Sequence, residues 1–222
     1  MGRLAVVLGS SAAGPRGRQM VAATEAAGAH VLQRHGSPYV LPHRIDHVAN
    51  IGSLVKAGCD RVIAVGSVGS LHAELGVGSL ICPDDFIAPQ IAVTSLDDER
   101  AHATPGFDPA WRRDVLAAWQ ADALPELRDG GVYWQTTGPR FETPAEVRLL
   151  AAHADVVGMT IAAECVVAGE LGLRYAAICC VDNLANGIEA EPLSPQEVDR
   201  HRESNATALA RGLSAVVPRL AR

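Results

Sequence analysis

The stretch Arg61-Val-Ile-Ala-Val65, followed directly by Gly66-Ser-Val-Gly-Ser70, joins a short apolar run to a segment of glycine and serine. The β-branched residues predict a buried strand, and the glycines predict a turn at its end. Similar apolar runs at 4–8 and 175–181 also end in polar residues. Segments of helical composition, each followed by glycine, lie between such runs at 19–27, 45–57 and 161–171.

This alternation predicts a single α/β domain over residues 1–222, with a mixed, mostly parallel central sheet flanked by helices. Further strands are expected at 30–33, 79–82, 131–136 and 155–158, and further helices at 111–119, 144–152 and 196–220. The stretch 83–109 has little periodicity and is rich in prolines and acids, so we expect a long functional loop there.

The composition argues against several classes of protein. A net charge of −6 over 222 residues disfavours a general nucleic-acid surface. Because we find neither a charged leader nor an apolar run long enough to cross a membrane, we expect a soluble, cytoplasmic protein with no membrane partner. The five cysteines lie in apolar runs without CxxC spacing, so we expect reduced core residues and no metal site.

Candidate ligand-binding residues recur where the predicted strands end. They are Ser10, Arg34, His35, Gly66, Ser67, Met159, Thr160 and Asn183. Ligands of such sheets gather at the carboxyl ends of the strands, so we expect these residues to meet there.

This group has the chemistry of an anion site. Arg34 can hold two phosphate oxygens with its planar fork, and His35 can donate a further hydrogen bond. Ser10 and Thr160 add hydroxyl groups, and Gly66-Ser67 adds backbone donors. The pattern is neither a Walker A loop nor GxGxxG, so triphosphate and dinucleotide binding are disfavoured.

The stretch Gly138-Pro-Arg-Phe-Glu-Thr143 supplies a carboxylate, and Asn183 supplies an amide. A carboxylate accepts from N–H groups, and an amide both donates and accepts. Together, Glu142 and Asn183 suit the edge of a 6-oxopurine base.

The chain resembles the trimeric purine nucleoside phosphorylase and methylthioadenosine phosphorylase family over roughly residues 31–198. The resemblance rests on Arg34-His-Gly36, His43 to Asn50, Gly66 to Leu71, Gly138 to Thr143, Gly158-Met-Thr160 and Asp182-Asn183. It implies phosphate-dependent cleavage of an N-glycosidic bond by a homotrimer, with inorganic phosphate as co-substrate and no other cofactor.

The resemblance also implies residue roles. Phosphate would be held by Ser10, Arg34, His35, Gly66, Ser67 and Thr160. Met159 would pack under the ribose, and Phe141 would stack near the base. Glu142 would accept from N1–H, while Asn183 would bind O6 and N7 and stabilise the departing base.

Several alternatives stay open. If the alignment is off by one residue, Asp182 replaces Asn183 and adenine replaces the 6-oxopurine. Relatives that cleave ordinary 6-oxopurine nucleosides have a histidine near the start of the last helix. Leu193 and Pro195 stand there instead, either forming an apolar pocket for a 5′-methylthio group or merely capping the helix. His102 either reaches a neighbouring subunit's pocket or lies in solvent.

The short segment before Arg34 and the glycine at position 66 are departures from the family that predict weakened phosphate recognition. A non-catalytic purine-binding protein with a decayed phosphate site is therefore an alternative to a 6-oxopurine nucleoside phosphorylase. A methylthioadenosine phosphorylase follows from the Asp182 alignment, and a nucleoside hydrolase is a further alternative, against which Arg34 and His35 argue.

Overall fold

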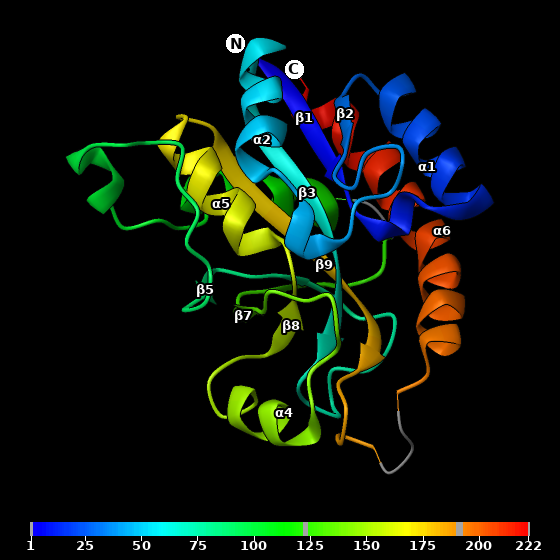
Figure 1. Ribbon diagram of the computed structural model, residues 1–222. Helices are drawn as coiled ribbons and strands as arrows, with labels where there is room; N and C mark the ends of the chain where they lie inside the picture. Colours follow the sequence, from blue (N-terminus) through cyan, green and yellow to red (C-terminus); the bar gives the residue numbers. More distant parts are fainter. Residues whose placement is uncertain (1, 122–123, 190–192, 222) are drawn as a thin grey trace.

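The computed structural model describes residues 2–121, 124–189 and 193–221. A nine-stranded mixed sheet with helices on both faces confirms the predicted α/β architecture (Figure 1). The strands are β1 Arg3–Leu8, β2 His30–Gln33, β3 Cys59–Ser70, β4 Leu80–Cys82, β5 Asp85–Ile87, β6 Leu127–Asp129, β7 Val132–Gln135, β8 Val156–Gly158 and β9 Arg174–Leu184. The α-helices are α1 Gly14–Ala26, α2 His47–Lys56, α3 Pro109–Gln120, α4 Pro144–Leu150, α5 Ile161–Glu170 and α6 Pro195–Leu220. Short 3-10 helices are η1 Ser10–Ala12, η2 Pro42–Arg44 and η3 Glu99–His102.

The central strand β3 belongs to two parts of the sheet. Its first half pairs in parallel with β1, and its last two residues pair antiparallel with β8. The strand β9 accompanies β3 in parallel along both halves, with a bulge between Val68 and Gly69. Because β1 ends at Leu8, the sheet opens beside the second half of β3. This opening lies at the carboxyl ends of β1 and β2, where open α/β sheets hold ligands.

The predicted turn at 66–70 is wrong, because these residues continue β3. The register with β9 runs from Arg61↔Arg174 through to Ser70↔Leu184. Glycine and serine predict a turn from local propensity, but a central strand with partners on both sides overrides that preference. Asn183 therefore lies inside β9 and not beyond its end.

Both faces of the sheet are covered. Alternate residues of β1, among them Leu4, Val6 and Leu8, pack with α1, α3 and α6. The intervening residues Ala5 and Val7 pack with α2 and α5 on the other face. Helix α4 covers a smaller third cluster beside β8. Continuous apolar runs are therefore required in the strands, as the sequence shows.

The predicted long loop at 83–109 contains β5 and η3, and β6 was not predicted at all. These strands are three residues long, and their pairing with β7 and β4 comes from distant parts of the chain. Helix α1 begins at Gly14, five residues before the expected start. All five cysteines are free and buried, as predicted. In the described ranges we find no helix with the length and apolarity that a membrane span requires.

Candidate functional site

A cavity occupies the opening of the sheet. Among the residues that line it are these predicted site residues: Ser10, Arg34, His35, Ser67, Phe141, Glu142, Met159, Thr160, Asn183 and Leu193. They come from η1, the segment after β2, strands β3 and β9, the loop before α4, the start of α5 and the segment before α6. The structure thus brings together residues that lie up to 183 positions apart in the sequence, from Ser10 to Leu193. Their roles toward a ligand stay predictions.

Hydrogen bonds hold both the side chain and the backbone of Glu142 in its loop. Thr136, which follows β7, donates from its hydroxyl to Glu142 Oε1 at 2.7 Å. Asn186 donates from Nδ2 to the Glu142 backbone oxygen, also at 2.7 Å. Thr143 caps α4 through a reciprocal pair of hydrogen bonds with Glu146. Glu142 is buried, and its Oε2 has no hydrogen-bond partner among the described residues, so this oxygen is available to a ligand.

Gly138 brings this loop close to Met159. Its φ of +62° lies in the region that glycine tolerates best. A Cβ at this position would lie 2.6 Å from Met159 Sδ, so only glycine permits this approach. Asn183 lines the same cavity and donates from Nδ2 to the Leu184 backbone oxygen at 3.0 Å. Glu142, Met159 and Asn183 therefore border one space.

Arg34 is buried, and one edge of its guanidinium is already occupied. Its Nε donates to Glu164 Oε1 at 2.6 Å, and its Nη2 donates to Glu164 Oε2 at 2.9 Å. Burial disfavours both charges, but each charge offsets that cost for the other: the pKa of Arg34 is raised and that of Glu164 is lowered. Glu164 thus takes one edge of the guanidinium, and Nη1 also donates to the Val65 backbone oxygen at 2.9 Å. The predicted grip of the fork on two phosphate oxygens would use the other edge, Nη1 and Nη2, and stays a prediction. Arg34 can offer a phosphate only its remaining Nη hydrogens.

His35 lies beside Arg34 with one ring nitrogen fixed. Its Nδ1 lies 2.7 Å from the Val40 backbone oxygen, which can only accept, so Nδ1 carries a proton. Burial, partly opposed by this hydrogen bond, lowers the pKa of His35, and the neutral ring leaves Nε2 as an acceptor. The predicted donation to phosphate therefore requires protonation of Nε2. Tyr39 stacks on the ring with centroids 4.3 Å apart.

Ser67 also has a partner within the protein. Its hydroxyl donates to Asp182 Oδ2, and Asn205 Nδ2 donates to Asp182 Oδ1 at 2.8 Å. Burial raises the pKa of Asp182, while these two hydrogen bonds oppose the rise. While Asp182 is ionised, the Ser67 hydroxyl points to it and offers only lone pairs to the cavity.

Thr160 stands at the start of α5 with no capping hydrogen bond from its own side chain. The Tyr133 hydroxyl accepts from the backbone N–H groups of Thr160 and Ile161 at 3.2 and 3.3 Å. Gln135 Oε1 accepts from Ala163 N at 2.9 Å. The backbone N–H groups of Thr160, Ile161 and Ala163 are thus satisfied internally, and Thr160 lines the cavity.

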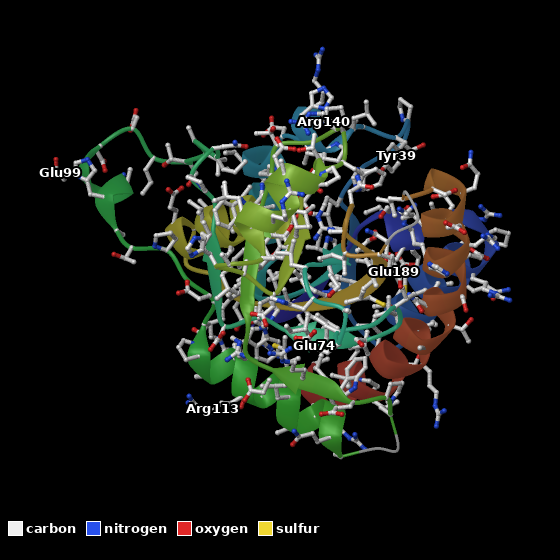
Figure 2. All side chains as sticks on the ribbon, turned by 90° about the horizontal axis from the view of Figure 1, so that it is seen from below. Tyr39, Glu74, Glu99, Arg113, Arg140 and Glu189 are labelled. Carbon is white, nitrogen blue, oxygen red and sulfur yellow. The ribbon has the colours of Figure 1, made fainter. Side chains whose placement is uncertain are left out.

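Of the other four predicted site residues, three lie outside the lining of this cavity, and one has a side chain outside the described part of the structure. The Gly66 position faces Ile161 of α5 and Cys179 of β9 and lies outside the cavity lining. Asp182 is sealed beneath Ser67, which removes it from direct contact with a ligand. His102 ends η3, whose first residue, Glu99, projects from the body of the molecule, away from Tyr39 (Figure 2). Pro195 begins α6, but its side chain is outside the described part of the structure.

The cavity and support residues that were missed include Glu164, Asn186 and Arg202. Glu164 carried a usable signal, because a carboxylate inside the apolar segment 161–168 needs a buried partner. Asn186 and Arg202 line the cavity without any local pattern that distinguishes them. Among the described residues, no group of three or more His, Cys, Asp or Glu side chains is placed to hold a metal ion.

The sequence matches the phosphorylase superfamily over residues 8–218. A probable 6-oxopurine nucleoside phosphorylase of Archaeoglobus fulgidus is 43% identical over 179 residues, which cover 79% of this chain and 73% of the relative. A probable S-methyl-5′-thioinosine phosphorylase of Xanthomonas campestris pv. campestris is 36% identical over 201 residues, covering 86% and 78% of the two chains.

The fold is similar to that of methylthioadenosine phosphorylase from Schistosoma mansoni in complex with tubercidin. The TM-score is 0.81 at 18% sequence identity, with 99% of this chain and 92% of that chain covered. At this identity the likeness extends to the fold alone.

Proposed function

Because the chain belongs to the phosphorylase superfamily, we propose that it is a purine nucleoside phosphorylase acting on a 6-oxopurine nucleoside. The substrate is 5′-methylthioinosine or inosine/guanosine, and the products are the free base and the corresponding ribose 1-phosphate sugar. The observation that carries this proposal is that one cavity joins the Glu142–Asn183 pair to the polar group around Arg34.

Base choice rests on donor and acceptor types. The unpartnered Oε2 of Glu142 accepts from the N1–H of hypoxanthine or guanine, and adenine has no hydrogen there. Asn183 keeps one Nδ2 hydrogen and its Oδ1 after donating to Leu184, so it can bind O6 and N7. The burial of Asp182 beneath Ser67 supports Asn183, not Asp182, as the base contact.

The reaction proceeds as positive charge grows on the sugar and negative charge grows on the purine. Asn183 stabilises the departing base near N7, where charge and a proton accumulate. Phosphate, held near Arg34, Ser10 and Thr160, captures C1′ of the sugar. The rate enhancement comes from positioning and electrostatics, with no nucleophile supplied by the protein.

The 5′ end of the sugar faces Leu193 and Val198. An apolar wall here favours a methylthio group over a hydroxyl, because burying an unpaired hydroxyl is costly. Relatives named for 6-oxopurine nucleosides and for methylthioinosine are both similar to this chain, so the two substrates are compared directly in the assay below.

The test is base release from methylthioinosine, inosine, guanosine and methylthioadenosine, each with and without inorganic phosphate. We expect release from the 6-oxopurine nucleosides only with phosphate. Release without phosphate would identify a hydrolase, binding without release a non-catalytic purine-binding protein, and preference for methylthioadenosine would overturn the base assignment. We also propose a homotrimer, to be measured by light scattering of the eluting protein.

A further inference from the structure

Arg202 of α6 lines the cavity at its polar end. It shares this wall with Ser10 and His35, and Val198, one helical turn earlier, lines the same cavity. Arg202 and Ser10 also border an adjoining hollow together with Ser11 and Gly14. Arg202 therefore stands between two spaces that meet at Ser10.

The hydrogen-bonding capacity of Arg202 is largely unused. Its Nη1 donates to Asp199 Oδ1 at 2.7 Å, and the Asp199 side chain is 71% exposed. Its Nε is buried and has no hydrogen-bond partner among the described residues, and Asp182 Oδ2 lies 3.8 Å from it. The Ser11 hydroxyl is likewise buried and unpartnered. Buried donors without acceptors are rare in folded proteins, so this place lacks an acceptor.

The charges around the cavity show which acceptor is missing. The charge of Arg34 is balanced by Glu164, and the neutral ring of His35 contributes no charge. Asp182 adds a buried carboxylate below Ser67. Without Arg202, an anion would face an excess of negative charge at this end of the cavity. Arg202, which pairs with Asp182 and Asp199, is the cation that offsets this negative charge.

We infer that Arg202 is a second phosphate-binding residue, held ready by Asp199 and Asp182, which compensates for an Arg34 fork partly taken by Glu164. This inference rests on the proposed phosphorolysis and names a further residue for its phosphate site. The ligand is inorganic phosphate, because Ser10 and His35, the neighbours of Arg202, belong to the polar end of the cavity and not to the Glu142–Asn183 end.

The experiment compares Arg202→Gln and Arg202→Lys with wild type in phosphate-saturation and nucleoside-saturation curves. We expect Arg202→Gln to raise the phosphate KM about tenfold, the loss of one charge-assisted contact. The nucleoside KM should change less than twofold, and Arg202→Lys should recover part of the phosphate affinity because it keeps the charge. Arg200→Gln is the matched control, since Arg200 is 72% exposed on the same helix and pairs only with Glu197 among the described residues.

Direct binding separates this inference from the proposed function. The thermal midpoint of each purified variant is followed against inorganic phosphate, with chloride at equal ionic strength. We expect the phosphate-induced rise in wild type and Arg200→Gln, and the same rise in Arg202→Gln only at about tenfold higher phosphate concentration. An unchanged phosphate KM and an unchanged phosphate-induced rise in Arg202→Gln would overturn the inference, as would a change confined to the nucleoside KM. If wild type releases base without phosphate, the proposed function fails, while this binding measurement still decides the role of Arg202.

Discussion

The buried pair of Arg34 and Glu164 predicts a large loss of stability on Glu164→Gln. The two side chains are 2% and 0% exposed, and Glu164 accepts two hydrogen bonds from Arg34 and one from the Tyr175 hydroxyl at 2.7 Å. Glutamine has nearly the same shape, but its NH2 group would face donors where Oε2 now accepts from both Arg34 and Tyr175.

The expected magnitude follows from the uncompensated charge. Removing one partner of a buried ion pair costs about 3–5 kcal/mol, because the other charge stays desolvated. At about 2–4 °C per kcal/mol for a chain of this size, the thermal midpoint should fall by roughly 6–20 °C. Urea unfolding at pH 7 measures the free energy of unfolding directly. Glu146→Gln is the control, since Glu146 also holds an arginine fork, that of Arg140, at the surface.

The same substitution should alter the acid limb of the stability curve. Although burial alone would raise it, the pKa of Glu164 is lowered in the folded protein by Arg34. The stabilisation from Glu164 is therefore present above the unfolded pKa and lost as pH falls through the folded pKa. Glu164→Gln should flatten that acid limb. A loss below about 1 kcal/mol at pH 7, the range of exposed pairs, would refute the reasoning.

Three further predictions concern the cavity. Asn183→Asp should shift the ratio of kcat/KM values from methylthioinosine toward methylthioadenosine by about tenfold, since a carboxylate cannot donate to O6; an unchanged ratio would mean that Asn183 is not the base contact. The Asn186 side chain links the Glu142 backbone oxygen, 2.7 Å from its Nδ2, to the Leu193 backbone N–H, 3.2 Å from its Oδ1. Asn186→Ala removes this link, so the nucleoside KM should rise about tenfold while the phosphate KM stays constant. Equal changes in both constants would contradict the role of this link. Burial lowers the pKa of His35, so the stability that its neutral ring contributes should be lost as pH falls from about 6.5 through the folded pKa. Between pH 8 and 5, the unfolding midpoint of His35→Asn should therefore change less steeply with pH than that of wild type. An unchanged slope would show that His35 does not titrate in this way.

The sequence by itself was enough for the architecture and for much of the site. Short apolar runs alternating with helical segments predicted the layered sheet, because these periods are local properties of the chain. The loop at Gly138 and the amide at Asn183 predicted the base-facing pair, because residue type limits what a side chain can donate or accept. The sequence therefore determined which chemical groups were available to the cavity.

Only the tertiary structure decided how those groups are used. The segment at 66–70 is a strand because β9 pairs with it, a fact absent from its glycine-rich composition. Arg34 finds Glu164 at a sequence separation of 130, and Ser67 finds Asp182 at 115, so two predicted phosphate ligands are partly engaged within the protein. Arg202 reaches the cavity from the last helix without any motif around it. Hydrogen-bond partners and net charge at a site depend on which distant segments pack together, and local sequence patterns do not specify that packing.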